Sequence, residues 1–474
     1  MKLSGWFKVI NNLLRLSLLF YAFPVLLALS ACDASEDGSA PDLEAFEKLT
    51  PSLAQAARQI RHQLDGELNP QLGSWPVDGI SASSAPRLAH LQFRAFTYAD
   101  AELAAFVQLG QASFLKLLDP VWGGVYQAAD QLDSQRQVIP GKRLADQADA
   151  LQTFAMAYQT SGEVRFRNGI EAVDDFLQES LASDAGTFYT SQSDQPENLP
   201  AHITPQRYWS LRTEHERRRF GLPPVEREID IDENAAIISA YVQAFAATGE
   251  SNYLRVAARA AESLLDTVPA ADPLAQAGMG LALLDLYSAT GEPGWLRAAQ
   301  ELALPLVSAL RDGGSLATAG SVDSSAAQQQ VAAKALTARL LYRLSVFARD
   351  PELAERALRL LASAVPDLAS DPSADRLDTV EVGLTLELFA AGFVEIAVAG
   401  DPQDLSTRRL FAAALRLYHP GKQLHFQAPG RFPELDQAAA YICNADLCSL
   451  PIIEPEQISI ALLDFVAPAQ TAYP

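Results

Sequence analysis

Four segments of the chain repeat one pattern, in which two amphipathic helices are joined by a tight turn. The segments begin at Ala155, Tyr241, Leu281 and Ala338. In each, apolar residues recur at spacings of three and four on both sides of the turn, which predicts helices that pack through one face. The turns read TSGE, TGES, TGEP and RDPE. The chain is therefore predicted to be mainly α-helical and built from helical hairpins.

Three of the four turns contain a glycine where the first helix should end. Gly162, Gly249 and Gly291 stand at the position that favours a residue tolerant of positive φ. Gly249 and Gly291 are 42 residues apart, and Gly162 and Gly249 are 87 apart, about two such periods. A helical-hairpin repeat of this length can form either an open solenoid or a closed ring.

Two long connections favour the ring. Residues 117–142 and 183–231 are long, rich in aromatic residues and not helical in pattern. Simple solenoids have short, regular links, whereas long structureless loops in a compact domain are usually functional. Long links on one side of a ring of hairpins are typical of an (α/α)6 toroid, in which they frame a central funnel. We predict such a toroid over residues 51–390.

The pattern changes after about Ala391. The runs VEIAVA, KQLHFQA and AAAYIC have the β-branched or alternating character of strands, and helices are predicted at STRRLFAAALRLYHP and EPEQISIALLDF. Residues 391–474 are therefore predicted to form a small α/β unit.

The N-terminus has the features of an export signal. Lys2, Lys8 and Arg15 precede an apolar run over 16–29 that ends in small residues. The run is shorter than the ~20 residues of a membrane-spanning helix. Residues 1–31 are therefore predicted to be a secretory signal peptide.

Leu29, Ser30, Ala31 and Cys32 resemble a bacterial lipobox. That resemblance implies that Cys32 is acylated and becomes the first residue, so that lipid chains hold the protein on the membrane. The alternative is a signal anchor in which Cys32 is incidental.

The composition of residues 32–50 predicts an acidic flexible tether, unless its end already begins the first helix. Asp33 resembles an inner-membrane retention signal of enterobacterial lipoproteins. The prediction is a lipoprotein of the cell envelope that faces the periplasm, with the membrane as one partner.

Cys443 and Cys448 are four residues apart in YICNADLCSL. In an oxidising periplasm two nearby cysteines tend to be bridged, and neither a C-x-x-C spacing nor further cysteines for a zinc site are present. A structural disulfide is the favoured interpretation. Free thiols and a redox pair are the alternatives.

The 474 residues carry a net charge of −22, with 49% hydrophobic and 20% charged residues. This is an ordinary globular composition. No stripe of Lys and Arg with interleaved aromatic residues is recognised, which disfavours nucleic acid as a partner. The acidic surface indicates solubility rather than a cationic substrate.

Several blocks in a shared order carry a resemblance to a known family: PVWGGVYQAAD, KRLADQADALQTFAMAYQTSGEVRF, LASDAGTFYTSQSDQPE, DENAAIISAYVQAFAATGE, VEIAVAGDP and AYICNADLCSLPIIEPEQI. From about Leu64 to Phe465 the chain resembles the toroidal part of the spermatogenesis-associated thioredoxin-like proteins and their bacterial relatives. The resemblance implies a six-hairpin glycosidase-like toroid with an α/β tail that includes both cysteines.

Two departures from that family bear on activity. No thioredoxin-fold domain precedes the toroid, and the family's Pro-His-Phe-Glu signature is replaced by VIPGKRLADQ. An acidic run of the family is reduced to Asp194 and Glu197. If those groups do chemistry in the relatives, this chain has lost it, so the question of an enzyme stays open and leans towards none.

Candidate catalytic residues are the acidic side chains near predicted helix starts and loops, because carbohydrate-acting toroids use one carboxyl as acid and another as base or nucleophile. They are Asp146, Asp194, Asp232 and Glu233. An ordinary N-cap cluster is favoured for Asp232 with Asn234, and a solvated or salt-bridged helix face is the alternative for Asp146.

Aromatic residues of the two long connections are candidate ligand-binding residues, because sugar rings stack on aromatic faces. Together with Asn234 they are Trp122, Tyr126, Tyr189, Tyr208 and Trp209. The alternative is that these rings only pack the loops onto the ring of helices.

None of the six histidines has metal-ligand spacing, so no metal site and no cofactor are predicted. His202, in the aromatic loop, is a weak candidate acid or base for an epimerase-like reaction. Two functions follow: a toroid that binds or processes a saccharide, or a non-catalytic scaffold that binds proteins at the membrane.

Overall fold

The computed structural model describes residues 50–66, 79–130, 138–311, 316, 324–370, 376–427, 431–433, 435–444 and 447–466. All of them belong to the unit Ala45–Pro474, which is separate from Met1–Glu44. The predicted signal peptide, Cys32 and Asp33 lie outside the described residues, so the lipid anchor stays a prediction. No helix in the described ranges is long and apolar enough to cross a membrane.

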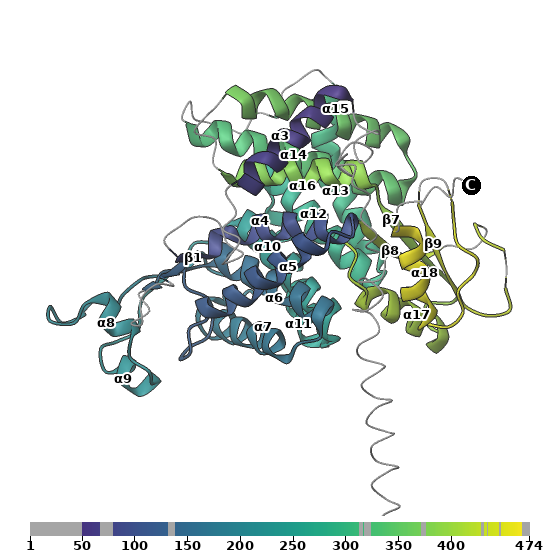
Figure 1. Cartoon of the computed structure of the whole chain (residues 1–474). Helices are drawn as coiled ribbons and strands as arrows, with labels where there is room; N and C mark the ends of the chain where they lie inside the picture. The colour runs from purple at the N-terminus through teal and green to yellow at the C-terminus, as the bar shows by residue number, and fades with distance from the viewer. Residues whose placement is uncertain are drawn as a thin grey trace, which may run out of the picture. The chain divides into compact units, whose positions relative to one another are not determined.

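Six inner helices form a closed ring, because each packs against two others and the last returns to the first (Figure 1). In ring order they are α4 (Ala85–Thr97), α6 (Leu144–Ser161), α10 (Ile231–Thr248), α12 (Pro273–Thr290), α14 (Ser324–Ala348) and α16 (Arg376–Ala391). The contact between α16 and α4 excludes an open solenoid.

Each inner helix has an outer partner packed against it. Matched to the inner helices from α4 to α16, the outer helices are α5 (Ala101–Phe114), α7 (Val164–Phe176), α11 (Ser251–Leu264), α13 (Pro293–Arg311), α15 (Pro351–Ser370) and α3 (Pro51–Gly66). The first helix of the ring, α3, thus completes the hairpin of the last one, α16. The predicted (α/α)6 toroid is confirmed.

The sequence separates inner from outer helices. In α11 the buried residues include Tyr253, Ala257, Ala260 and Leu264, which repeat every three or four positions and leave the other face polar. Helix α12 is instead buried over most of its length. A helix that is apolar nearly all round belongs inside, and one with a single apolar stripe belongs outside.

Short turns join the inner helices to their outer partners at one end of the ring, which we call the base. Gly162, Gly249 and Gly291 end α6, α10 and α12 with φ of 70°, 78° and 71°, as predicted. In the fourth turn Arg349 adopts a φ of 54° without a glycine. A Cβ on Gly291 would lie 2.2 Å from a ring carbon of Phe426, so this turn packs closely on the C-terminal unit.

The C-terminal unit is a three-stranded sheet of order β8-β7-β9 with two helices, as the pattern predicted. Strand β7 pairs in parallel with β8 and antiparallel with β9. The elements are β7 (Val394–Ala399), α17 (Leu405–Arg416), β8 (Lys422–Gln427), β9 (Ala439–Cys443) and α18 (Gln457–Val466). Contacts of α17 with α10 and of β8 with α12 hold the unit on the ring.

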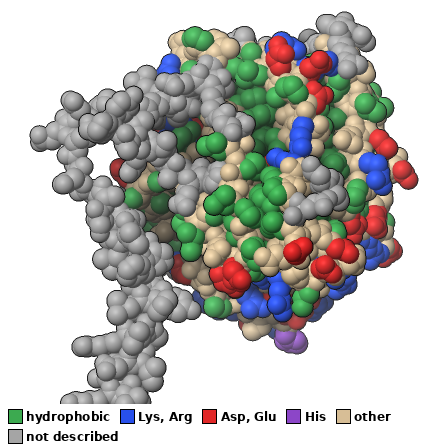
Figure 2. Space-filling model, turned by 90° about the vertical axis from the view of Figure 1, so that its right-hand side faces the viewer, with side chains coloured by type: hydrophobic (Ala, Val, Ile, Leu, Met, Phe, Trp, Pro, Cys, Tyr) green, Lys and Arg blue, Asp and Glu red, His purple; other side chains and the backbone are tan. Residues whose placement is uncertain are grey.

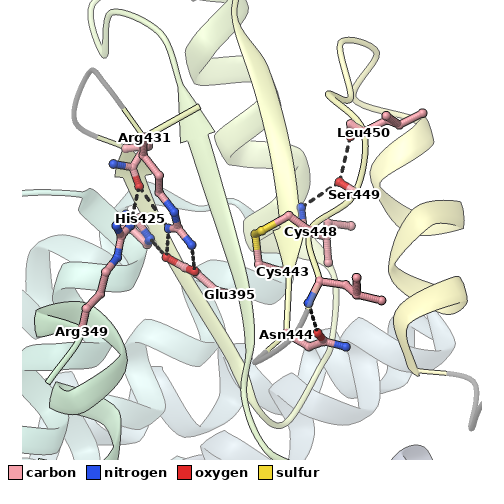
Figure 3. Close-up of a disulfide and its surroundings, with 12 residues drawn as sticks. Arg349, Glu395, His425, Arg431, Cys443, Asn444, Cys448, Ser449 and Leu450 are labelled. Atoms are coloured by element: carbon pink, nitrogen blue, oxygen red, sulfur yellow. Dashed lines mark hydrogen bonds and ion pairs between the residues drawn. A yellow bond between two sulfur atoms is a disulfide. The ribbon is translucent and has the colours of Figure 1, made fainter. Parts of the chain in front are cut away.

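A disulfide joins Cys443, at the end of β9, to Cys448 (Figure 3). The segment that follows Cys448 returns along β9, where the backbones of Ala440 and Ile452 exchange hydrogen bonds of 2.8 and 2.9 Å. In this structure the cysteine pair therefore fixes a return segment that covers the edge strand. Glu395 of β7 accepts hydrogen bonds from His425 of β8 and from Arg431, which follows β8.

The long connections lead into the inner helices at the other end of the ring, which we call the mouth. Their strands, together with β1 before α4, form two small antiparallel sheets, β1-β2-β3 and β4-β5-β6. The strands are β1 (Gly79–Ser81), β2 (Ala128–Asp130), β3 (Val138–Ile139), β4 (Lys142–Arg143), β5 (Ser191–Gln192) and β6 (Val225–Glu226). Four short turns of 3-10 or π type are η1 (Ala82–Ser84), η2 (Leu115–Leu117), η3 (Leu177–Leu181) and η4 (Leu265–Thr267).

Between β5 and β6 the chain makes an excursion over residues 193–224, which we call the arm. It contains α8 (Pro205–Trp209) and α9 (Glu214–Arg218) and extends away from the ring in Figure 1. The two ends of the arm are fixed at the mouth, because β5 pairs with β4 directly before α6 and β6 is followed by α10.

Candidate functional site

A cavity of about 470 Å³ runs through the centre of the ring and is lined by residues of all six inner helices. We call it the channel. Its volume falls in the range of small-molecule pockets, about 300–1,000 Å³. The toroid alone accounts for its position, since six inner helices around one axis leave their facing side chains to line the space between them.

Three carboxylates line the channel near the mouth: Asp149 of α6, Asp232 of α10 and Glu381 of α16. All three lie in the first half of their helices, so the topology brings them to one end of the ring. Helices α6 and α10 are neighbours. Glu381 is also close enough to Asp149 to raise its pKa by repulsion.

Asp149 and Asp232 are shifted towards their uncharged forms. Burial raises the pKa of Asp232 to about 7, and repulsion by Asp230, Asp272 and Glu233 adds to the effect. Burial, followed by repulsion from Asp146 and Glu381, raises the pKa of Asp149 well above its usual range.

Unpaired acids of this kind favour protonation, because a low-dielectric site with like charges penalises the ionised form. The buried Oδ1 of Asp232 has no hydrogen-bond partner among the residues that the structure describes. At neutral pH the mouth therefore presents Asp232 about half protonated, beside Asp149, whose pKa is also raised by burial.

Two other carboxylates of the channel are paired with arginines of α14. Glu381 accepts a hydrogen bond from Arg339, and Asp285 of α12 accepts one of 2.7 Å from Arg343. Arginines four residues apart lie on one helix face, so both pairs lie along one wall. The channel therefore combines carboxyls that lack a strong cation partner with carboxylates that have one.

The C-terminal unit lines the base end of the channel with the segment between α17 and β8. Tyr418 and His419 of this segment lie there with Phe93 and Phe393. Burial, with a smaller contribution from Lys422, lowers the pKa of His419 to about 3. Its imidazole is therefore neutral over the physiological range. The base end combines these rings with polar side chains, among them Asp285, Arg343 and Lys422.

The four predicted catalytic residues have different surroundings. Asp232 lines the channel. Asp146 is buried, is not among the channel residues, and accepts two hydrogen bonds of 2.8 Å from Arg143, the salt-bridged alternative. Glu233 follows Asp232, and burial and the nearby Asp230 raise its pKa to about 7. Asp194 is exposed on the arm and is not among the channel residues.

An N-cap is present, but at Asp230, two positions before the predicted Asp232. The N-cap of α10 is Asp230, whose carboxylate accepts the backbone N–H of Glu233 at 2.9 Å. Asp232 is thus free of capping. Asn234 exchanges hydrogen bonds of 2.8 and 3.0 Å with the backbone of Phe188, and it also donates to the carbonyl of Asp230. The side-chain amide of Asn234 is therefore used to hold the loop that contains Phe188, and not to bind a ligand.

The predicted aromatic residues come together, but around a buried arginine rather than on the channel wall. Ring centroids of Trp122 and Tyr126 lie 5.8 and 5.5 Å from Trp209, and Tyr208 lies 5.3 Å from it. Tyr189 lies apart from them, under Arg227.

Tyr208 is fully buried, Trp209 is 4% exposed and Tyr126 is 2% exposed. None of the four lines the channel. In this structure the faces of these rings are used in packing. Packing was the alternative to ligand binding in the sequence analysis.

Arg217 is at the centre of this aromatic cluster. Its guanidinium donates to Asp119 at 2.7 and 3.0 Å, and the ammonium of Lys142 donates to the same carboxylate at 2.9 Å. Although burial opposes ionisation, the two cations hold the pKa of Asp119 at about 2. This buried ion cluster fastens the arm to the connection before α6.

The sequence interpretation missed Asp149, Glu381, Arg339 and Arg343. Asp149 follows Asp146 by three positions, so it lies on nearly the same face of α6, a signal that was present. The other three give no sign of their role until the ring closes, because α14 and α16 meet α6 only across the channel.

No family model and no curated protein matches the chain. The resemblance to the spermatogenesis-associated thioredoxin-like family therefore stays a prediction.

Solved structures with similar helix arrangements are carbohydrate-processing enzymes by their descriptions. A D-mannose isomerase has 15% identity and a TM-score of 0.46, over 66% of this chain and 85% of its own. A cellobiose 2-epimerase from Bacillus thermoamylovorans B4167 has 11% identity and a TM-score of 0.45, over 65% of this chain and 87% of its own. The α-1,6-mannanase GH76A from Salegentibacter sp. HEL1_6 has 13% identity and a TM-score of 0.38, over 55% and 88%.

Proposed function

We propose that the protein binds and processes a saccharide in the channel of its toroid, as a lipoprotein held at the cell envelope by Cys32. One observation carries the proposal. Asp149 and Asp232 are carboxyls with raised pKa at the mouth, and Glu381 beside them is paired with Arg339. Pairs of carboxyls whose surroundings drive their pKa values apart are the usual basis of acid and base roles.

The proposed chemistry needs one protonated carboxyl and one ionised carboxylate. A protonated carboxyl can donate a proton to the oxygen that leaves or opens, while an ionised carboxylate accepts one or stabilises developing positive charge. Asp149 is assigned the role of acid, and Asp232 or Glu381 the role of base. The same carboxyls and the two arginines offer hydrogen bonds to hydroxyl groups. At the base end the rings of Phe93 and Phe393 offer an apolar surface for a sugar face.

The cell location rests on the N-terminal signal alone. The lipobox ending at Cys32 and the acidic tether that follows predict an exported protein fixed to a membrane by acyl chains. Asp33 favours the inner membrane of a periplasm-facing protein. Metabolic labelling with radioactive palmitate, compared between the natural chain and Cys32→Ser, tests this part. Absence of Cys32-dependent label contradicts it.

Thermal unfolding in the presence of saccharides tests the channel. The chain from residue 33, with Cys32 excluded, is screened against mono- and oligosaccharides that include peptidoglycan fragments. A ligand at 100 times its dissociation constant adds ~2.7 kcal/mol to the stability, a visible shift in melting temperature. We expect Asp149→Asn to abolish turnover of any ligand found, and Asp266→Asn, an exposed carboxyl of the outer ring, to leave it unchanged.

No shift with any saccharide, from a protein that unfolds cooperatively, contradicts the proposal. A shift that Asp149→Asn leaves intact, without any turnover in the natural chain, reduces the channel to a binding site.

The second candidate is a scaffold that binds another protein, and one observation favours it. The C-terminal unit exposes several large apolar side chains, among them Leu450 at 85%, Leu447 at 69%, Ile460 at 65% and Leu463 at 62%. Hydrophobic side chains also gather on the face that carries this unit in Figure 2. Exposed apolar patches commonly mark contact surfaces. If Leu450→Ser with Leu463→Ser abolishes function in the cell while saccharide turnover is intact, the scaffold role is favoured.

A further inference from the structure

The arm has a charge opposite to that of the rest of the protein. The chain as a whole carries −22, yet five arginines and only two glutamates lie between Pro205 and Arg219. Aromatic residues are interleaved with them in RYWSLRTEHERRRF, a stripe that the sequence interpretation did not recognise. A local cationic surface on an anionic protein attracts anionic partners to that surface alone.

The five arginines divide into two groups by their partners. Arg217 is buried against Asp119, and Arg218 pairs with Glu214 of its own helix. Arg207, Arg212 and Arg219 are exposed, and the structure gives none of their side chains an ion-pair partner among the residues it describes. Three guanidinium groups therefore face solvent with their charge uncompensated.

The whole arm, residues 193–224, also contains Asp194 and Glu197, so its five arginines and four acidic residues give a net charge of +1. The two glutamates between Pro205 and Arg219 do not neutralise the three exposed arginines. Glu214 is engaged by Arg218, and Glu216 closes a capping box with Thr213, whose hydroxyl lies 2.8 Å from its carboxylate. The arrangement differs from an ordinary solvated helix face, in which charges of both signs alternate.

The arm is held rigidly enough to present these groups. Arg217 donates to the carbonyls of Leu211 and Trp209 as well as to Asp119. The hydroxyl of Tyr208 donates to the carbonyl of Gly221 at 2.9 Å, which ties α8 to the end of α9. The arginines on α8, on α9 and between them are thus fixed on one small unit.

The position of the arm relates it to the channel. Strands β5 and β6 flank the arm and belong to one sheet with β4. In this sheet β4 directly precedes α6, and β6 is followed by α10. These are the helices that carry Asp149 and Asp232 at the mouth. A polymer bound along the arm is therefore held at the end of the ring where the channel carboxyls lie.

We propose that the arm binds the anionic groups of an acidic polysaccharide, and that this is the class of substrate whose chain end enters the channel. The inference rests on the proposed saccharide function and adds the charge of the substrate. Planar guanidinium groups suit carboxylate, sulfate and phosphate groups, which they bind in a bidentate manner. Uncharged and cationic polymers gain nothing from three unpaired arginines.

Two other polyanions fit less well. Single-stranded nucleic acid binds through stacking of its bases on aromatic faces beside cationic groups, but the arm buries Tyr208 and Trp209 completely or nearly so. An anionic membrane usually requires clusters of about four to eight cationic side chains, and the rest of this surface is acidic. A polysaccharide with spaced charges needs neither feature.

Binding of the chain from residue 33 to polymers at several salt concentrations tests the proposal. The probes are polygalacturonate, dextran sulfate and neutral dextran. We expect binding to an anionic polymer and none to dextran. The triple variant Arg207→Gln, Arg212→Gln, Arg219→Gln should lose affinity by about tenfold or more, and its slope of log affinity against log salt should fall by about 2 to 3.

A matched control removes three exposed arginines elsewhere: Arg58→Gln of α3, Arg297→Gln of α13 and Arg409→Gln of α17. It has the same net charge as the arm variant, and we expect its affinity to stay within about twofold of the natural chain. Equal losses in the two variants would show a nonspecific charge effect and overturn the proposal.

Failure of the arm can be told apart from failure of the channel. Asp149→Asn should keep polymer binding, whereas the arm variant should keep the thermal shift given by short saccharides. Absence of binding to both anionic polymers overturns the proposal, even if the channel binds sugars. So does tighter, arm-dependent binding of oligo(dT) or of vesicles that contain phosphatidylglycerol.

Discussion

Two carboxylates near the mouth, the buried Asp119 and the half-buried Asp232, have opposite surroundings. Asp119 accepts hydrogen bonds from Arg217 and Lys142, and these cations hold its pKa at about 2 in spite of burial. Asp232 has one buried oxygen without a partner in the described part of the chain, and its pKa is about 7. Burial alone therefore does not decide the charge of a carboxyl in this protein. The nearby cations do.

The difference separates a structural role from a chemical one. Buried charges that have partners fix one conformation. Removing one partner leaves the other charge buried and uncompensated, which destabilises the folded protein. Carboxyls without hydrogen-bond partners destabilise the folded protein, and groups with perturbed pKa values are concentrated at functional sites. The first kind anchors the arm, and the second lines a channel that could receive a ligand.

The largest expected effect is at Asp119. Asp119→Asn removes the carboxylate that Lys142 and Arg217 share, leaving two fully buried cations without it. We expect a loss of about 3–5 kcal/mol in the free energy of unfolding, because breaking a buried ion pair leaves uncompensated charge. Urea unfolding followed by circular dichroism measures it. Asp266→Asn is the exposed control, and a loss below about 1 kcal/mol at Asp119 would contradict the structural role.

Asp232→Asn should increase the free energy of unfolding rather than decrease it, and the size of the increase should depend on pH. Since the pKa of Asp232 is raised to about 7 in the folded protein, the folded state binds more protons than the unfolded state between pH ~4 and 7. The stability that this residue provides is complete below pH ~4 and is lost as the pH rises towards 7.

An amide cannot ionise, so the variant should be more stable than the natural chain at pH 8, by on the order of 2 kcal/mol. The advantage should shrink towards pH 4. Melting temperatures at pH 4, 6 and 8 measure it, and a destabilised variant at pH 8 would mean that Asp232 has a partner in solution. As a control, Asp266→Asn removes an exposed carboxyl that is not among the charges acting on Asp232.

The ring could be predicted because each of its features is local. Three turn glycines and the three-and-four spacing of apolar residues specify the hairpins, and the long connections distinguish a toroid from a solenoid. The C-terminal strands were also evident from β-branched runs. Closure itself needed α16 to pack on α4, a contact between helices that begin 291 positions apart and that no periodicity encodes.

The site was harder to predict, for a physical reason. The aromatic residues of the long connections were expected on the channel wall, but an arginine whose partner is nearly 100 residues away, Arg217 with Asp119, draws them into a packed cluster. Asp232 was recognised because it stands at a helix start. Asp149 was overlooked in the middle of a helix, where a carboxylate usually means a solvated face.

The smallest effect concerns the interaction of Asp146 with Asp149 one turn later in α6. Asp146 is the largest charge contribution that raises the pKa of Asp149, while Arg143, which Asp146 engages, lowers it. In Asp146→Asn the repulsion is removed and Arg143 is released, so both changes should lower the pKa of Asp149. The carbonyl band of the protonated carboxyl in infrared titrations reports it, with Asp146→Asn/Asp149→Asn as the blank.

An unchanged titration would mean that burial alone keeps Asp149 protonated, and Asp149 would then not respond to charges brought by a ligand. A lowered pKa would mean that the protonation of Asp149 is set by its neighbours. An anionic substrate group placed near the mouth would then raise the pKa again, so that binding of an acidic saccharide would itself help to keep the acid protonated.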